Sequence, residues 1–293
     1  SVMQFEEQTR VYREMIEKYL ASIYAPFESE PQKPIFEAAN YSLLAGGKRL
    51  RPILALEFCR VCGGEPEKAL PFGAAVEMIH TYSLIHDDLP CMDNDDYRRG
   101  RLTNHKVYGE GMAVLAGDAL LTDAFAVATR TELPEPGKIG EAIGILSECA
   151  GSLGMIGGQV LDIMSEERKC TKQEVLDIQS RKTGRLITAP CVLGVIAGGG
   201  TEAQKEAAAR FAALLGLAFQ IRDDMLDVIG SQAELGKATG MDAEKNTFVR
   251  LYGLDKCGEL VERYTQEAIA ALDAFAEKDY LVALAKSLTD RRA

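Results

Sequence analysis

The spacing of the apolar residues constrains the fold of this chain more than any other feature of the sequence. Apolar residues recur every three or four positions, as on one face of an α-helix, and the alternation typical of half-buried strands is almost absent. The segments with the helical period are 11–22, 69–86, 112–128, 139–153, 172–178, 203–229 and 258–275. Helix-breaking glycines and prolines separate many of them, at 46–47, 63–64, 134–137 and 198–200, and no linker divides the chain. The sequence therefore predicts one all-α domain over residues 1–293, a large bundle of ten or more helices.

Composition and charge narrow the class of protein. The 293 residues include 33 Lys and Arg against 44 Asp and Glu, so the formal net charge is −11, and 47% of the residues are hydrophobic. This content suits a sizeable core, and the acidity argues against a protein that coats nucleic acid. Seven scattered cysteines, an odd number, favour reduced thiols and a cytoplasmic location.

We expect neither a targeting segment nor a membrane span, and thus a soluble protein. Residues 1–10 are polar and lack the apolar core of a signal peptide. The longest uncharged run, between Arg185 and Glu202, contains Pro190 and is too short to cross a bilayer. This run is predicted to be a buried helix.

Two clusters of aspartates each end an apolar helical stretch. The clusters consist of Asp87, Asp88 and Asp93, and of Asp223, Asp224 and Asp227. In a helix, Asp223 and Asp227 lie about 40° apart around the axis and roughly 6 Å apart along it. Carboxylates placed so close repel each other unless a cation lies between them. Oxygen ligands select a hard cation, and Mg²⁺ shared with phosphate oxygens is the best candidate.

The context of the first cluster favours a site over an ordinary acidic turn. Pro90 interrupts the helix, so Asp93 need not lie on the face that Asp87 occupies. A single Asp-rich stretch usually faces water. Two such stretches, each following an apolar stripe, make that interpretation weaker. Neither has the central Gly and terminal Glu of an EF-hand loop.

Compact basic groups supply the cations that a phosphorylated substrate needs beside a metal. They are Lys48, Arg49 and Arg51 after Gly46-Gly47; Arg98, Arg99 and Arg101 after the first acidic cluster; Arg181, Lys182 and Arg185; and Lys237 after the second cluster. Arg binds phosphate through planar, bidentate hydrogen bonds and Lys binds it as a point charge. Each group taken alone is more typical of a solvated helix end or loop. Lys48 lacks the glycine spacing of a nucleotide P-loop.

Together, these motifs resemble those of the trans-isoprenyl diphosphate synthases, most closely the bacterial farnesyl diphosphate synthases. The resemblance covers nearly the whole chain in the expected order. The matching motifs are Gly47-Lys48-Arg49-Leu50-Arg51-Pro52, His80 with Tyr82-Ser83-Leu84-Ile85-His86-Asp87-Asp88, Met92-Asp93-Asn94-Asp95-Asp96 with Arg98-Arg99-Gly100, Ala116-Gly117-Asp118, Gly157-Gly158-Gln159, Lys182-Thr183-Gly184 and Phe219-Gln220-Ile221-Arg222-Asp223-Asp224.

The resemblance implies the isoprenoid synthase fold, in which helices surround a central cavity, and usually a homodimer. It implies three Mg²⁺ ions per active site with substrate bound, held by Asp87, Asp88, Asp93, Asp223, Asp224 and Asp227. It assigns the allylic diphosphate to Arg98, Lys182, Lys237 and Lys245, and isopentenyl diphosphate to Lys48, Arg51, His80 and Arg99. Lys182, Thr183 and Gln220 are the implied catalytic residues near the developing allylic cation. The segment 241–247 that contains Lys245 is shorter than in many relatives.

The implied reaction joins isopentenyl diphosphate to dimethylallyl or geranyl diphosphate. The allylic diphosphate ionises, the isopentenyl double bond attacks the cation, and a proton leaves. Metal ions and Arg or Lys neutralise the leaving diphosphate, and exclusion of water protects the cation. The resemblance further implies that the released diphosphate takes the proton, since no side-chain base stands out in the motifs.

The residues four and five positions before Asp87 are the candidates for limiting product length. Tyr82, an aromatic residue in the fifth position, and the two-residue expansion at Leu89-Pro90 resemble enzymes that stop at fifteen carbons. In a helix, Ser83 lies almost directly below Asp87, whereas Tyr82 is offset by about 140°. Ordinary core packing is the alternative role of Tyr82.

Several alternatives stay open. The same chemistry with a twenty-carbon product, geranylgeranyl diphosphate, is the nearest, and a non-catalytic partner subunit of a heteromeric synthase is another. A class I terpene cyclase shares acidic motifs but is not expected to have a second Asp-rich motif with Gly47-Lys48-Arg49-Leu50-Arg51-Pro52. The Cys59–Cys62 spacing lacks a second ligand pair for zinc. Cys91 has no partner for chemistry, and His86 and His105 are expected to be structural.

Overall fold

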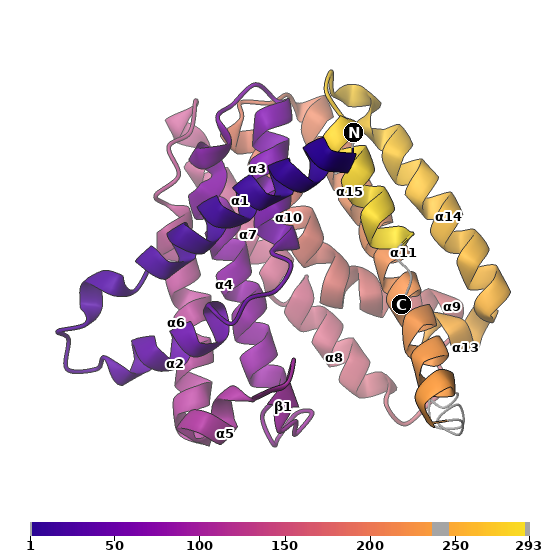
Figure 1. Cartoon of the computed structure of the whole chain (residues 1–293), viewed down its shortest axis with the longest axis horizontal. Helices are drawn as coiled ribbons and strands as arrows, with labels where there is room; N and C mark the ends of the chain where they lie inside the picture. Colours follow the sequence, from indigo (N-terminus) through magenta and orange to yellow (C-terminus); the bar gives the residue numbers. More distant parts are fainter. Residues whose placement is uncertain (1, 236–245, 291–293) are drawn as a thin grey trace.

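The computed structural model describes residues 2–235 and 246–290, with the side chains of 231–235 left out. Within these ranges the chain is almost entirely helical, which confirms the predicted all-α class (Figure 1). The helices are α1 (Val2–Ser22), α2 (Pro34–Leu43), α3 (Leu50–Val61), α4 (Leu70–Asp87), α5 (Asn104–Tyr108), α6 (Glu110–Ala128), α7 (Ile139–Ala150), α8 (Met155–Ser165), α9 (Lys172–Gln179), α10 (Arg185–Ala197), α11 (Glu202–Leu235), α13 (Phe248–Tyr252), α14 (Leu254–Ala271) and α15 (Asp279–Thr289). Short 3₁₀ turns at Ala25–Phe27, Pro66–Ala69, Pro136–Lys138 and Leu272–Ala274 connect some of them.

The breaker clusters of the sequence fall between helices as expected. Gly46 and Gly47 have φ of 92° and 126°, a region that disfavours side chains, and they lie between α2 and α3. Several predicted boundaries differ: the opening helix begins at Val2 rather than at 11, and the helix expected over 258–275 is Leu254–Ala271. The helix expected over 139–153 ends at Ala150, because Gly151 is extended. The helix expected over 203–229 runs from Glu202 to Leu235.

Helix α4 lies in the middle of the core. It packs against α3 and α6 and also touches α1, α2 and α10 (Figure 1). Phe72, Val76 and Ile79 are at most 1% exposed, as the apolar face of this segment predicts. The uncharged run after Arg185 forms α10, whose side chains are mostly buried, again as predicted. Helix α11 packs against α10 on one side and α14 on the other.

A small antiparallel hairpin was not predicted. Strands β1 (Tyr97–Arg98) and β2 (Arg101–Leu102) pair with Arg98 opposite Arg101. The turn residues Arg99 and Gly100 both have positive φ, 51° and 77°, as a two-residue turn with matching twist requires. The strands are too short for an alternating pattern to reveal them, although a residue before Gly in a basic loop is a weak turn signal.

Two stretches of the described residues are long and apolar enough to cross a membrane, Glu110–Ala128 and Pro136–Ser165. Core helices of globular proteins pass the same test, so two such stretches are weak evidence for a span. The second stretch is interrupted between α7 and α8, and α6 packs along α4.

Candidate active site

A cavity of about 740 Å³ opens beside the start of α3 and the end of α4. Its walls come from the turn before α3, from α4, from the β1–β2 hairpin and from the middle of α11. All four residues predicted to bind isopentenyl diphosphate line this cavity, namely Lys48, Arg51, His80 and Arg99. Segments from different parts of the chain thus bring these four predicted residues together.

The cavity is strongly electropositive at its basic end. Burial lowers the pKa of His80 well below its usual value, and the nearby guanidinium groups of Arg51 and Arg99 lower the pKa further. His80 is therefore neutral at physiological pH and offers a hydrogen bond without adding charge. Burial also lowers the pKa of Arg51, and its Nε has no hydrogen-bond partner among the described residues. An unpaired buried donor beside other cations suits an anion.

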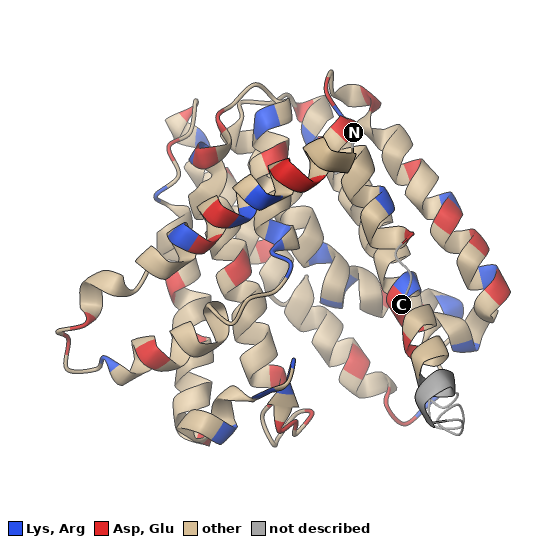
Figure 2. Ribbon diagram, viewed as in Figure 1, with Lys and Arg blue, Asp and Glu red and all other residues tan. Residues whose placement is uncertain are grey.

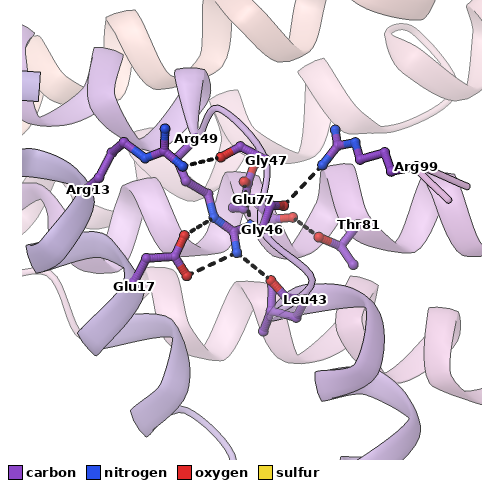
Figure 3. A network of polar contacts seen from close by, with 9 residues as sticks. All are labelled: Arg13, Glu17, Leu43, Gly46, Gly47, Arg49, Glu77, Thr81 and Arg99. Carbon is purple, nitrogen blue, oxygen red and sulfur yellow. Dashed lines mark hydrogen bonds and ion pairs between the residues drawn. The ribbon is translucent and has the colours of Figure 1, made fainter. Parts of the chain in front are cut away.

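Arg49, the third cation of this basic motif, is turned into the protein instead. Its φ is 56°, and its side chain is 2% exposed. The guanidinium pairs with Glu17 of α1 at 2.6 Å and with Glu77 of α4 at 2.9 Å, and donates to the carbonyl of Leu43 (Figure 3). Because two carboxylates neutralise it, Arg49 fixes the turn rather than offering charge to a ligand.

The first acidic cluster begins where α4 ends. Asp88 is 3% exposed and accepts two hydrogen bonds from Arg98, at 2.9 Å from Nε and 2.8 Å from Nη2. The sequence assigned Asp88 to a metal and Arg98 to the allylic diphosphate, whereas the two side chains pair with each other in the structure. The backbone N–H of Asp93 donates to the carbonyl of Asp87 at 2.8 Å, which folds the loop back over the end of α4.

Asp87 is held by a glutamine whose role the sequence did not predict. Gln159 of α8 donates from Nε2 to Oδ1 of Asp87 at 2.5 Å. Burial raises the pKa of Asp87 to about 6, Lys182 lowers it, and Asp93 raises it. Burial also raises the pKa of the Asp93 carboxyl, which Lys182 in turn lowers. The hydrogen bond from the Asp93 N–H to the Asp87 carbonyl holds the backbones of these two predicted metal ligands close together.

Lys182 lies on an unusual segment that links α9 to α10. Residues Ser180–Gly184 form a π-helix, which was not predicted, and such turns are frequent at functional sites. Lys182 Nζ pairs with Asp162 of α8 at 2.7 Å. Gly158 of α8 touches the backbone of Lys182 so closely that even a Cβ would collide with it. Helix α8 thus positions both Asp87 and Lys182. In the sequence, the motif Gly157-Gly158-Gln159 was the signal that this helix contributes to the site.

The second acidic cluster continues the cavity wall along α11. Gln220 lines the cavity, as Thr183 does, and Asp223, Asp224 and Asp227 follow it at helical spacings of three, four and seven. Burial raises the pKa of Asp224 to about 6, and the backbone N–H of Phe248 donates to its Oδ2 at 3.0 Å. Lys237 and Lys245, predicted to bind the allylic diphosphate, lie outside the described residues.

Both clusters have the donors that Mg²⁺ prefers but are not closed cages. Within the part of the chain that the structure describes, no three acidic, His or Cys side chains are close enough to hold an ion by themselves. The raised pKa values of Asp87 and Asp224 show carboxylates crowded and poorly solvated, a situation that a hard cation relieves. The residues therefore fit a partly hydrated Mg²⁺ that a diphosphate helps to hold.

Comparison with known proteins decides the family. The family model described as polyprenyl synthetase matches residues 32–283. The chain belongs to the polyprenyl synthetase family. It is 51% identical over 247 residues to the heterodimeric geranylgeranyl pyrophosphate synthase large subunit 1 of Arabidopsis thaliana, covering 82% of this chain and 66% of that protein. It is 47% identical to the farnesyl diphosphate synthase of Micrococcus luteus, over 90% of this chain and 89% of that protein.

The fold agrees with a solved relative as well. The apo crystal structure of an FPP/GFPP synthase from Zymomonas mobilis matches with a TM-score of 0.87 at 34% identity, covering 98% of this chain and 100% of that one. The predicted isoprenoid synthase fold is thereby confirmed. The family and its named members support prenyltransferase activity on prenyl diphosphates, while those names include both farnesyl and geranylgeranyl synthases.

In this member of the family, the two candidates for limiting product length, Tyr82 and Ser83, do not line the described cavity. The Ser83 hydroxyl donates to the carbonyl of His80 at 2.6 Å. Tyr82 is 8% exposed, and its ring meets the His86 ring edge-on at 5.3 Å. His86 Nε2 donates to the carbonyl of Val114 in α6 at 2.9 Å, so Tyr82 and His86 lie on the side of α4 that faces α6.

Among the described residues, the remaining sequence motifs have packing and hydrogen-bonding roles. All seven cysteines are free, and the Cys59 thiol donates to the carbonyl of Glu65. Burial raises the pKa of Cys59 to about 12 and that of Cys62 to about 11, which disfavours reactive thiolates. His105 has a structural role, since its Nε2 donates to the carbonyl of Asp95 at 2.9 Å.

Proposed function

We propose that this protein is a farnesyl diphosphate synthase, which condenses isopentenyl diphosphate with dimethylallyl or geranyl diphosphate. The observation that carries the proposal is the cavity in which Lys48, Arg51, His80 and Arg99 meet, bordered by Asp88 and Gln220. Each acidic cluster begins within one helical turn of residues that line this cavity. A cationic pocket between two carboxylate clusters suits two diphosphates, one bound by protein cations and one bound through metal.

The residues that would hold Mg²⁺ are Asp87 and Asp93 on one side and Asp223, Asp224 and Asp227 on the other. When bound, Mg²⁺ neutralises the charge that develops on the leaving diphosphate. We assign Asp88 an indirect role, because both of its oxygens accept from Arg98. Asp88 thereby orients the Arg98 guanidinium toward the allylic diphosphate. Lys182, held by Asp162, supplies a second cation there, and Lys237 and Lys245 stay predictions.

The chain's own residues account for the remaining demands of the reaction. Ionisation breaks the bond between the allylic C1 and its diphosphate oxygen, the isopentenyl double bond forms a new carbon–carbon bond, and a proton is lost. Thr183 and Gln220 present oxygen dipoles at the cavity, which stabilise positive charge. Leu84, Ile85 and Phe219 line the same cavity with apolar surface and keep water from the cation.

Tyr82 supports the fifteen-carbon product over the twenty-carbon alternative. Its buried ring meets the ring of His86, which is bonded to α6, so in this proposal the product chain extends toward the side of α4 that faces α6 and stops at Tyr82. Geranylgeranyl diphosphate synthesis is the second candidate, because the Arabidopsis relative at 51% identity is named for that product. The partner-subunit alternative is disfavoured by the presence in one chain of both acidic clusters and of all four residues predicted to bind isopentenyl diphosphate.

We also propose that the protein acts as a homodimer in the cytoplasm. Large apolar side chains are more than half exposed on α6, on α8 and just before α8, namely Leu115, Leu153, Val160, Ile163 and Met164. Exposed apolar residues in such numbers are typical of an interface with another chain. Seven free cysteines favour a reducing compartment.

Turnover tests the reaction itself. The protein is incubated with isopentenyl and dimethylallyl diphosphates and Mg²⁺, and released diphosphate is measured with and without a chelator. We expect release that needs both substrates and stops with the chelator. Release from dimethylallyl diphosphate alone at the same rate would indicate a hydrolase or cyclase instead.

A further inference from the structure

The N-terminal helix α1 reaches the cationic cavity through a residue that no motif identified. Arg13 lines the cavity together with Lys48, Arg51 and Arg99. Its Nη2 donates to the carbonyl of Gly47 at 2.9 Å (Figure 3). Gly47 directly precedes Lys48, so Arg13 contacts the backbone that presents the first pocket cation.

Two guanidinium groups hold the Gly46–Gly47 turn from opposite sides. Arg13 binds the Gly47 carbonyl, and Arg99 Nη1 donates to the Gly46 carbonyl at 3.1 Å (Figure 3). A Cβ on Gly47 would lie 2.5 Å from Arg99 Nη1, so the glycine leaves the space that this contact needs. The turn is thus fixed by two cations that also line the cavity.

Helix α1 contributes a second contact to the same turn. Glu17 lies four residues after Arg13 and therefore on the same face of the helix. It accepts from Arg49 at 2.6 Å, as described above. One face of α1 thus supplies a donor to Gly47 and an acceptor to Arg49. Both contacts act on the segment that places Lys48 and Arg51.

The charges favour Arg13 as a contributor to anion binding. Arg49 is neutralised by Glu17 and Glu77. Among the described residues no carboxylate lies within ion-pair distance of Arg13, and its guanidinium donates to the Gly47 carbonyl. Figure 2 shows that α1 carries both basic and acidic side chains along its length, so the helix as a whole is not a basic surface. Arg13 is an exposed residue that also lines the cavity.

We propose that Arg13 is a positioning residue of the homoallylic diphosphate site, and that α1 belongs to that site through its contacts with Gly47 and Arg49. Arg13 holds the Gly46–Gly47 turn and adds positive charge at the cavity. This inference rests on the proposed function for the identity of the substrate. A diphosphate group is the ligand that the chemistry of the pocket selects.

Binding and kinetics of Arg13 variants test the proposal. Inorganic diphosphate is titrated by calorimetry in the presence of a chelator, so that metal-dependent binding at the aspartates is absent. Arg13→Met is expected to weaken this binding about ten-fold, the size of one charge-assisted hydrogen bond, and to raise KM for isopentenyl diphosphate similarly. The kcat and the KM for dimethylallyl diphosphate are expected to change less than about two-fold.

Two further variants separate positioning from general stability. Arg13→Lys retains a charged donor, and we expect it to recover most of the lost affinity. Arg10→Met is the matched control, because Arg10 lies one turn earlier on α1 and pairs with Glu7 and Glu14 outside the cavity. It is expected to bind diphosphate as the unmodified protein does.

The outcomes distinguish this proposal from the proposed function. Unchanged diphosphate binding in Arg13→Met would overturn the role of Arg13, even if condensation proceeds normally. The proposal would also be overturned if both KM values rose and kcat fell by similar factors, because a general structural defect affects all three constants. If the unmodified protein binds diphosphate but does not condense the substrates, the proposed function fails while the binding comparison still decides the role of Arg13.

Discussion

Asp87 and Asp224 determine how the acidic clusters respond to pH. Burial raises the pKa of each to about 6, above the ordinary value of 3.8. A carboxyl with a raised pKa in the folded state stabilises the metal-free fold at low pH, and this contribution is lost as pH rises through about 6. Above that pH both carboxylates are charged, each among the other aspartates of its own cluster. A bound cation therefore stabilises the folded protein most in this pH range.

Mg²⁺ is therefore expected to stabilise the protein in a pH-dependent way. The increase in Tm on adding Mg²⁺ should be largest above about pH 7 and should shrink as pH falls through about 6, because protons then compete for the same oxygens. Thermal melts at several pH values, with and without Mg²⁺, measure this. In an Asp87→Asn, Asp224→Asn double variant the increase should be small at every pH. An increase that is constant across the range contradicts the account.

Tyr82 is the residue on which product length is predicted to depend. Tyr82 is 8% exposed on the side of α4 that faces α6, and Tyr82→Ala removes its ring and so the proposed stop to chain growth. We expect the product to shift from fifteen to twenty carbons, as measured by mass spectrometry. Ser83→Ala, which removes a hydroxyl bonded to the His80 carbonyl, is the control and should keep the fifteen-carbon product. If Tyr82→Ala still stops at fifteen carbons, Tyr82 is a packing residue only.

At the residue scale, the sequence predicted which side chains gather but not which of them pair. The four residues predicted to bind isopentenyl diphosphate were expected together, and they line one cavity. The pairing of Arg49 with Glu17 and Glu77 could not be predicted. It depends on a left-handed backbone conformation at Arg49, with a φ of 56°, which the sequence does not reveal. The pairing of Asp88 with Arg98 depends on the unpredicted hairpin that places Arg98 beside α4.

At the scale of elements, helix α8 holds predicted site residues from two other elements in place. Gln159 binds Asp87, Asp162 binds Lys182, and Gly158 permits contact with the π-helix. Helical periodicity predicted most helices because long apolar stripes report on burial. The π-helix escaped prediction because it differs from an α-helix by its backbone hydrogen bonds and not by its apolar pattern.

Gly158→Ala tests whether close contact of α8 with the π-helix supports activity. The new methyl group would collide with the backbone of Lys182, which cannot rotate away. We expect a loss of about 1–3 kcal/mol in the free energy of unfolding, and a fall in kcat beyond what partial unfolding explains. Denaturant unfolding and steady-state kinetics measure the two effects.

Gly258→Ala in α14 is the matched control for that substitution. There the new Cβ would make an ordinary contact, 3.7 Å from Met225 Cε. Since Ala favours a helix interior over Gly, this variant should unfold at equal or higher denaturant, by about 0.5–1 kcal/mol. Equal behaviour of the two variants would show that Gly158 has no special role.

At the scale of the whole molecule, the apolar surface predicts an assembly. We expect a particle of twice the 31.9 kDa chain mass in sedimentation velocity. Leu115 is 56% exposed on α6, and Leu115→Glu should shift the protein toward the monomer, because a buried, unpaired carboxylate is costly. Val2→Glu, at a residue 74% exposed on α1, should leave the mass unchanged. A monomeric unmodified protein would contradict the proposed homodimer.

The central claim is that one cavity condenses two prenyl diphosphates and stops at fifteen carbons. The most direct measurement is mass spectrometry of the product formed from isopentenyl and dimethylallyl diphosphates with Mg²⁺. The account predicts farnesyl diphosphate as the end product even when isopentenyl diphosphate is in excess, and no product with a chelator. A twenty-carbon end product would contradict the role of Tyr82, and the absence of any condensation product would contradict the proposed function itself.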